Sequence, residues 1–186
     1  MTSLTPKIFL ETERLILREL IPEDAEAMFR MDSDPEVHTY LGNKPVQSLQ
    51  ETKDIIEFVQ TQYHNFGIGR WAAIEKSTGA FIGWAGLKYF DKEVNKRIHF
   101  YDLGYRFKKK YWGLGYATEA AKACVEYGFN TLQLKEIHGM TDSGNRASRN
   151  VLEKAGLKFI EPFLFENDPS DWFMITREEF LEQKKS

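Results

Sequence analysis

Residues 101–125 of this 186-residue chain, YDLGYRFKKKYWGLGYATEAAKACV, constrain the fold more than any other stretch. The first half alternates large apolar or aromatic residues with polar or small ones: Tyr101, Leu103, Tyr105 and Phe107. Such a period of two predicts a strand with one face in a core. The second half repeats apolar residues at helical spacing: Ala117, Ala120, Ala121, Cys124 and Val125. The stretch therefore predicts a strand, a turn and a helix in immediate succession.

Two glycines, Gly113 and Gly115, lie in the turn between the predicted strand and helix. Glycine adopts positive φ without strain and, having no Cβ, lets a ligand approach the main chain closely. The first N–H groups of a helix have no internal partner and carry about half a positive charge, so they attract anions. Basic residues lie just upstream: Arg106, Lys108, Lys109 and Lys110. The turn is a candidate phosphate site, although a tight turn with a solvated basic edge explains the same residues.

Two common phosphate-binding motifs do not match this turn. A P-loop needs Gly, four residues and then Gly-Lys-Ser/Thr, and no segment of the chain has that spacing. A dinucleotide fingerprint needs a third glycine where the chain has Thr118, and an acidic residue at the end of the next strand. Glu136 precedes that strand, predicted at Ile137 to Thr141, instead of ending it. A nicotinamide-dependent enzyme is therefore a poor fit.

The pattern that does match is a basic residue, two spacers and then Gly-x-Gly-x-Ala: Lys110, Gly113, Gly115 and Ala117. This segment resembles the acetyl-CoA pyrophosphate loop of the GNAT N-acetyltransferase superfamily, and YWGLGYATEA resembles that loop in the RimJ/RimL-like branch. ETERLILREL near the start and NRASRNVLEKAGLKF near the end are similar to the same branch, so the resemblance covers most of the chain. The family usually has Arg or Gln at the position of Lys110, and a lysine keeps the charge.

The composition is typical of one globular domain, which we expect to span residues 1–186. Hydrophobic residues make up 42% and aromatic residues 14%, enough for a single core. A net charge of −3 argues against nucleic acid as the main partner. The single cysteine, Cys124, lies on an apolar helix stripe and is interpreted as a structural thiol. MTSLTPKIFL lacks a secretory apolar region and no run of about 20 apolar residues could span a membrane, which predicts a cytoplasmic protein with no membrane partner.

Hydrophobic period and chain breakers predict the remaining elements. After a loose lead-in over residues 1–10, the predicted strands are 14–19, 70–75, 81–89, 98–107, 137–141, 158–165 and 172–176. The predicted helices start at 22, span 51–66, run from 117 to about 128–131, span 146–155, and open the tail at 177. Residues 32–49 and the acidic segment 166–171 are predicted loops. Short connections make the strands of 70–107 an antiparallel meander, whereas the crossover helix before 137–141 predicts a parallel pair.

The family resemblance implies the same arrangement. It implies an α+β fold in three α/β layers, with a GNAT-like mixed, mostly antiparallel sheet, a parallel, splayed strand pair, and helices on both faces. In the family the pantetheine arm of acetyl-CoA inserts into the splayed pair like an extra strand. The resemblance therefore implies acetyl-CoA as co-substrate, held at its thioester end by main-chain groups and at its pyrophosphate by the glycine turn. The implied cofactor-binding residues are Leu103, Gly104, Tyr105, Lys110, Tyr111, Trp112, Gly113, Leu114, Gly115, Tyr116, Ala117 and Asn145.

Direct acetyl transfer needs a neutral amine, a polarised thioester carbonyl and a proton for the departing thiolate. Asp102 lies on the central predicted strand where the family often has Glu, and it is our first candidate for the base. Because an ordinary Asp has a pKa of about 3.9, this role requires burial or an intervening water, and an ordinary strand hydrogen bond is the alternative. Asn145 and Ser148 share one face at a helix start, which fits capping. The resemblance places Ser148 near the sulfur as a proton donor.

The predicted function is acetyl-CoA-dependent N-acetylation of a primary amine, on a protein N-terminus or a small molecule. A non-catalytic acyl-CoA-binding or sensing domain is the alternative, since Asp102 and Ser148 are compatible with both. By analogy, the loops 32–49 and 166–171 border the acceptor, and their carboxylates attract a cationic group, although solvated acidic turns explain them equally well. His99 and His138 lie on neighbouring predicted strands without further ligands, so we expect no metal.

Overall fold

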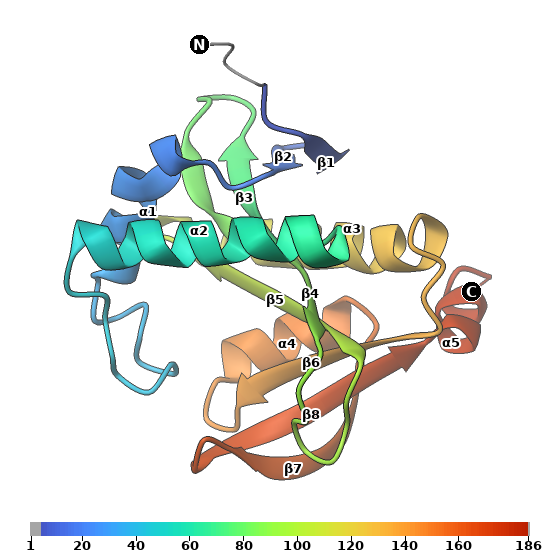
Figure 1. Cartoon of the computed structure of the whole chain (residues 1–186). Helices are drawn as coiled ribbons and strands as arrows, with labels where there is room; N and C mark the ends of the chain where they lie inside the picture. Colours follow the sequence, from blue (N-terminus) through green and yellow to red (C-terminus); the bar gives the residue numbers. More distant parts are fainter. Residues whose placement is uncertain (1–4, 186) are drawn as a thin grey trace.

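Eight strands form one sheet in the computed structural model, which describes residues 5–185 (Figure 1). The strands are β1 Ile8–Glu11, β2 Leu15–Arg18, β3 Arg70–Glu75, β4 Phe81–Phe90, β5 Phe100–Phe107, β6 Glu136–Asp142, β7 Lys158–Phe165 and β8 Asp168–Thr176. The helices are α1 Ala25–Asp32, α2 Leu49–Phe66, α3 Tyr116–Asn130, α4 Arg146–Lys154 and α5 Arg177–Gln183, and two 3-10 turns are η1 Pro22–Asp24 and η2 Lys109–Tyr111. The strand order is β1-β2-β3-β4-β5-β6-β8-β7.

Capping residues explain where the helices begin and end. The Ser48 side chain accepts a hydrogen bond from the N–H of Glu51, so α2 starts two residues before its predicted start. At the other end of α2, Gly67 adopts the left-handed conformation with φ of +69°. Asn145 caps α4 in the same way as Ser48, by accepting from the N–H of Ser148. These local signals are why the predicted helices are confirmed.

The sheet is mostly antiparallel, as predicted. Within residues 5–185, β5 and β6 are the one parallel pair, and α3 is the crossover between them. Their pairing is confined to Asp102 opposite His138. The strands therefore part beyond these residues, at the carboxyl end where β5 continues toward the glycine turn. The predicted meander is present, with β3 pairing β4 and β4 pairing β5.

Helices cover both faces of the sheet. One core packs α1 and α2 against β3 and β4 and includes Met28, Ile56 and Ala72. The other core packs α3 and α4 on the opposite face and includes Cys124 and Leu152. In Figure 1, α2 crosses in front of the sheet, while α3 and α4 lie behind it. The result is the three-layer arrangement predicted from the element order.

Two sequence predictions about the chain's edges are wrong. Within the predicted lead-in, residues 8–11 form β1, which pairs antiparallel with β2 at the edge of the sheet, and residues 1–4 lie outside the described part. The predicted acidic loop 166–171 shrinks to a two-residue turn, because β8 already begins at Asp168. Glu166 and Asn167 have φ of +50° and +76°. Two consecutive positive φ values match the right-handed twist of a tight hairpin, which needs no longer loop.

Candidate active site

The turn between β5 and α3, residues 108–117, is here called the anion loop. Gly113 and Gly115 have φ of +73° and +85°, as the sequence predicted, and Gly115 is the residue immediately before the first turn of α3. Within residues 5–185, no atom other than those of Gly113 and its two chain neighbours lies within 4 Å of where a Cβ on Gly113 would stand. The main chain is therefore open to a ligand at the positive end of a 15-residue helix.

Arg14, just before β2, holds the anion loop by a contact that the sequence did not predict. Its Nη1 donates to the main-chain oxygen of Leu114 at 3.0 Å, and its guanidinium lies 4.1 Å from the ring centroid of Tyr116. Its Nε donates to Glu119 Oε2 at 2.6 Å. Arg14 therefore connects the start of β2 to the anion loop through Leu114 and to α3 through Glu119. Arg14 belongs to ETERLILREL, a segment that resembles the family, and that resemblance was the one sign in the sequence that Arg14 could matter to the site.

Glu119 on α3 balances the charge of Arg14 and ties the loop to the β1–β2 turn. Its Oε1 accepts from the Thr12 hydroxyl at 2.6 Å and from the main-chain N–H of Arg14 at 2.9 Å. Burial raises the pKa of Glu119, but these hydrogen bonds and Arg14 outweigh it and leave the pKa below its usual value. A carboxylate therefore stays ionised beneath the loop and holds Arg14 in place.

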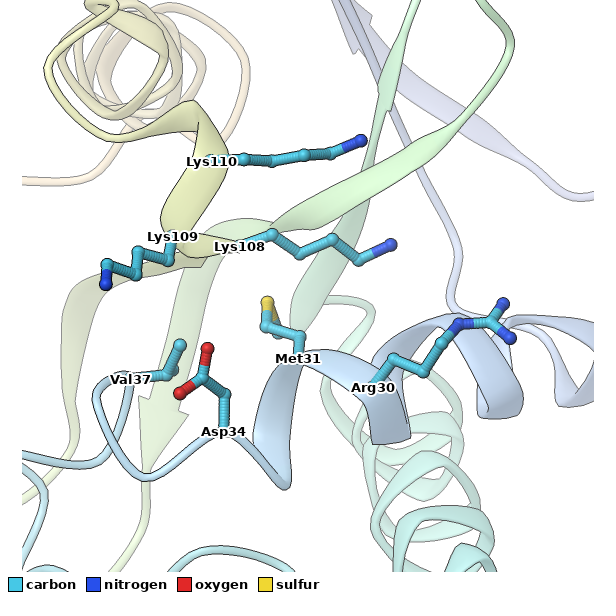
Figure 2. A pocket seen from close by; sticks show the side chains of 7 residues that line it. All are labelled: Arg30, Met31, Asp34, Val37, Lys108, Lys109 and Lys110. Atoms are coloured by element: carbon cyan, nitrogen blue, oxygen red, sulfur yellow. The ribbon is translucent and has the colours of Figure 1, made fainter.

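A basic hollow of about 520 Å³ lies beside the anion loop (Figure 2). Its lining residues are Arg30, Met31, Asp34, Val37, Lys108, Lys109 and Lys110. In Figure 2 the charged ends of Arg30, Lys108 and Lys110 point to the same side, whereas Lys109 points the other way and pairs with Glu36. Burial first, and then Arg30 and Lys110, lower the pKa of Lys108. Arg30, Lys108 and Lys110 repel one another, and an anion bound between them would relieve that repulsion. The hollow is therefore complementary to an anion.

At the parting of β5 and β6, two hydroxyls meet. The Tyr105 hydroxyl lies 2.9 Å from the main-chain oxygen of Ser148 and 3.0 Å from its Oγ. Asn145 holds the same residue, since its Oδ1 accepts from the N–H of Ser148 at 3.0 Å. Burial raises the pKa of the Tyr105 phenol, so the phenol keeps its proton at neutral pH. The structure thus brings together three predicted site residues, and the role of the Tyr105 side chain is one that the sequence did not predict.

Asp102 is 4% exposed and is held in an ion pair. Its Oδ2 accepts from Arg70 Nη2 at 2.5 Å, and Arg70 Nη1 donates to the main-chain oxygens of Asp102 and Gly86 at 2.6 Å each. The other oxygen, Oδ1, has no hydrogen-bond partner within residues 5–185. Burial raises the pKa of Asp102 and Arg70 opposes this shift. A Cβ on Gly104 would stand 2.5 Å from the Arg70 guanidinium, which explains the glycine there.

A second ion pair lies on the same face of the sheet, which we call the charged face: Arg70, Trp84, Lys88, Asp102 and Arg106. Lys88 stands opposite Asp102 and Trp84 opposite Arg106 across β4 and β5, so their side chains share one side. Arg106 Nη1 donates to Asp32 Oδ1 at 2.8 Å. The Trp84 ring has both guanidiniums near it, with Arg106 at 5.0 Å and Arg70 at 5.6 Å. Asp32 begins the predicted acceptor loop 32–49, which this pair anchors to the sheet.

Cys124 and His99 lie apart from this chemistry, whereas His138 is the residue opposite Asp102 on β6. Cys124 is fully buried, and burial raises the pKa of its thiol to about 12, so it remains a neutral packing residue. His138 accepts from Trp172 Nε1 and contacts Glu136, whereas His99 precedes β5 and contacts the Tyr89 hydroxyl. In the described part of the chain, no three His, Cys, Asp or Glu residues are grouped to hold a metal ion.

Comparisons with known proteins agree with this geometry. Residues 14–158 match the family model described as an acetyltransferase (GNAT) domain. The chain is 33% identical over 193 residues to the FsC-acetyl coenzyme A-N(2)-transacetylase of Aspergillus fumigatus, covering 95% of this chain and 79% of that protein. It is 26% identical over 140 residues to the spermidine N(1)-acetyltransferase of Escherichia coli K12, covering 75% and 70%. A GNAT-family acetyltransferase from Bacillus anthracis superposes with a TM-score of 0.76 at 26% identity, covering 91% and 98%.

The parted parallel strands and the anion loop define an acetyltransferase fold. The chain belongs to the GNAT acetyltransferase family. Among residues 5–185, no helix is both long and apolar enough to cross a membrane.

Proposed function

We propose that this chain transfers the acetyl group of acetyl-CoA directly to a primary amine. The observation that carries the proposal is the anion loop, where Gly113 and Gly115 open the N-terminus of α3 beside the parted β5 and β6. Main-chain N–H groups of residues 110–117 hold the pyrophosphate, with Arg14 fixing the loop from Leu114. Lys108 and Lys110 add positive charge beside them. The pantetheine arm lies between β5 and β6, near Leu103, Gly104 and Asn145.

In the reaction, the amine nitrogen attacks the thioester carbonyl carbon, and the C–S bond breaks as the amide forms. Asp102 takes the proton from the amine through Oδ1, the oxygen that Arg70 leaves free. Its burial favours this role, because a raised pKa makes a carboxylate a stronger base. Ser148 donates a proton to the departing thiolate, and the Tyr105 hydroxyl, in contact with Ser148 Oγ, supports it.

The names of the relatives support an N-acetyltransferase but differ in the acceptor. One is named for transfer from acetyl coenzyme A to an N(2) position and the other for spermidine. The chain's own acceptor therefore has to be argued from its own residues. A single domain, membership of the RimJ/RimL-like branch and a cytoplasmic location stay predictions from the sequence.

A screen of amines for release of free CoA thiol tests the proposal. The panel contains small monoamines, diamines, amino acids and peptides with free N-termini, each incubated with acetyl-CoA and with or without the protein. We expect at least one amine to release thiol in step with its own acetylation, measured by mass spectrometry. If no amine is acetylated although the protein binds acetyl-CoA, the domain is an acyl-CoA-binding module instead.

A further inference from the structure

A second hollow, of about 730 Å³, lies on the α2 side of the sheet, among the C-terminal half of α2, the end of β4 with its following loop, and the tip of the β7–β8 hairpin. These three segments can be located in Figure 1. The apolar lining consists of Phe58, Phe66, Tyr89, Phe90, Val94, Leu164 and Phe165. Phe58 is 57% exposed and Leu164 is 69% exposed. Exposed and half-buried apolar side chains gathered around one concave site indicate a ligand with an apolar body.

Lys88 brings a positive charge into this hollow. Its Nζ lies 4.6 Å from the ring centroid of Phe90 and 5.7 Å from that of Phe58. Among residues 5–185, Lys88 has its ring contacts with Phe90 and Phe58, while Arg70, Asp102 and Asp91 act on its charge from farther away: burial and Arg70 lower its pKa, and the two carboxylates oppose this. A partly buried ammonium that contacts aromatic rings is complementary to an anionic group on a ligand.

A negative counterpart lies next to Lys88, behind the residues that line the hollow, where it is paired with Arg70. Asp102 is the residue opposite Lys88 on the neighbouring strand, and side chains so placed have Cβ atoms about 5 Å apart. Asp102 Oδ1 and, on the α2 wall, Gln62 Oε1 are buried acceptors with no partner within the described residues. Gln62 is 6% exposed and lines the hollow. Buried acceptors without partners are costly and fit a ligand that donates N–H groups.

The two charges match the two ends of an α-amino acid. Its amino and carboxylate groups are on one carbon, and the charged side chains of Asp102 and Lys88 face from adjacent strands. We propose that the acceptor is an α-amino acid with an apolar or aromatic side chain. Its amine donates to Asp102 and Gln62, its carboxylate binds Lys88, and its side chain packs against Phe58 and Phe90. This inference rests on the proposed function, which leaves the acceptor open.

The mouth of the hollow carries more negative than positive charge. Asp91, Glu93 and Glu166 outnumber Lys92 there, so the mouth attracts amines in general, and discrimination among them has to come from Lys88 inside the hollow. A short diamine would place a second ammonium near Lys88, and like charges in a partly buried site repel. Polyamines of that kind are therefore disfavoured.

The test compares L-phenylalanine with 2-phenylethylamine, which lacks only the carboxylate, in the wild type and in Lys88→Met. We expect the wild type to prefer L-phenylalanine by about 10- to 100-fold in kcat/KM, the value of a hydrogen bond to a charged group. Lys88→Met should remove that preference, and Lys88→Arg should keep it. Lys92→Met, which removes a lysine from the rim of the same hollow, is the matched control and should leave the ratio unchanged. An equal or better rate with 2-phenylethylamine, or a ratio that Lys88→Met does not change, overturns the inference.

Calorimetry separates this inference from the proposed function. L-phenylalanine is titrated into the protein saturated with CoA. Binding that Lys88→Met weakens, with no thiol release when acetyl-CoA replaces CoA, supports the amino-acid site and contradicts the proposed transfer. Acetylation of amines without a carboxylate, with no binding of L-phenylalanine, supports the transfer and contradicts the amino-acid site.

Discussion

In the anion loop, we expect main-chain N–H groups to contact the ligand, with Lys108 and Lys110 adding positive charge beside them. On the charged face the chemistry belongs to side chains, since Arg70, Lys88 and Asp102 come from three different strands. Two glycines with positive φ and a helix start define the loop locally. The charged face exists only when β3, β4 and β5 pair in their observed register. We therefore expect substitutions in the anion loop to weaken acetyl-CoA binding, and substitution of Asp102 on the charged face to lower kcat.

Replacing Asp102 tests the charged face with the largest expected effect. Asp102→Asn should lower kcat by about 10² to 10⁴, because the base is lost, while acetyl-CoA affinity stays constant. Because burial raises the pKa of Asp102, the acidic limb of the wild-type rate profile should lie above the usual Asp range, with activity rising as pH rises. The variant should lose that limb. The measurement is kcat against pH together with calorimetric titration of acetyl-CoA.

Asp24→Asn is the matched control for this substitution. The ion pair of Arg18 and Asp24 is as buried as that of Arg70 and Asp102. Both aspartate side chains are 6% exposed, and the arginine side chains are 16% exposed in the first pair and 14% in the second. Breaking either buried pair should cost about 3–5 kcal/mol of folding free energy, so both variants lose stability. If Asp24→Asn loses as much turnover as Asp102→Asn, the effect is structural. If Asp102→Asn keeps nearly full turnover, we would assign the base to a water held by main-chain groups.

The loop is tested by Gly115→Val. A branched side chain at φ of +85° strains the backbone at the residue before α3, and its Cβ would stand 3.4 Å from Arg14 Nη2. Loss of two hydrogen bonds to a charged phosphate should weaken acetyl-CoA binding by about 10² to 10³. Gly79→Val is the control, since Gly79 has φ of +69° and open space around it but lies in the β3–β4 turn. If both variants are folded and bind acetyl-CoA equally well, the loop does not bind the phosphate.

Arg14 offers a smaller, more specific test of the same loop. Arg14→Met removes the hydrogen bond to Leu114, so the KM for acetyl-CoA should rise about tenfold with kcat nearly unchanged. Lys76→Met is the control, because Lys76 Nζ bonds the main-chain oxygen of Thr12 in the neighbouring turn without contacting the loop. Steady-state kinetics, measured as KM for acetyl-CoA and kcat in both variants, is the test. A fall in kcat with an unchanged KM would assign Arg14 to the chemical step.

The smallest effect concerns His38, beside the pair of Arg106 and Asp32. Burial, followed by Arg106, lowers the pKa of His38. The unfolded chain then binds a proton near pH 6.5 that the folded chain does not, so stability is present above pH 6.5 and is lost as pH falls. Each unit of pKa difference amounts to about 1.4 kcal/mol, or a few degrees in Tm. His38→Phe should flatten the Tm profile between pH 6.5 and 5, whereas His64→Phe, at an exposed position, should not.

The elements that the sequence predicted well are those set by neighbours in the chain. The period of residues 101–125, the positive φ of Gly113 and Gly115 and the cap Asn145 are local signals, and each is confirmed. The turn 166–167 and strand β1 were missed, since an edge strand needs a partner and a two-residue turn without glycine gives a weak signal.

Long-range contacts account for what was missed in the site. Arg14 and Leu114 are 100 residues apart in the chain, and Arg70 and Asp102 are 32 apart. Asp102 was predicted as a site residue from a family position, and nothing in its own segment indicated Arg70. Register across β3, β4 and β5 decides which charges meet. The alternation along one strand predicts which face a side chain lies on, but not which residue of the next strand lies opposite it.

The central claim, that the anion loop holds acetyl-CoA, is tested most directly by the melting temperature. A ligand at about 100 times its Kd adds about 2.7 kcal/mol to the folded state, which corresponds to about 5–10 °C for a chain of this size. We predict that acetyl-CoA raises Tm by this amount and that NAD leaves it unchanged. No shift with acetyl-CoA, together with a clear shift with NAD, would contradict the account.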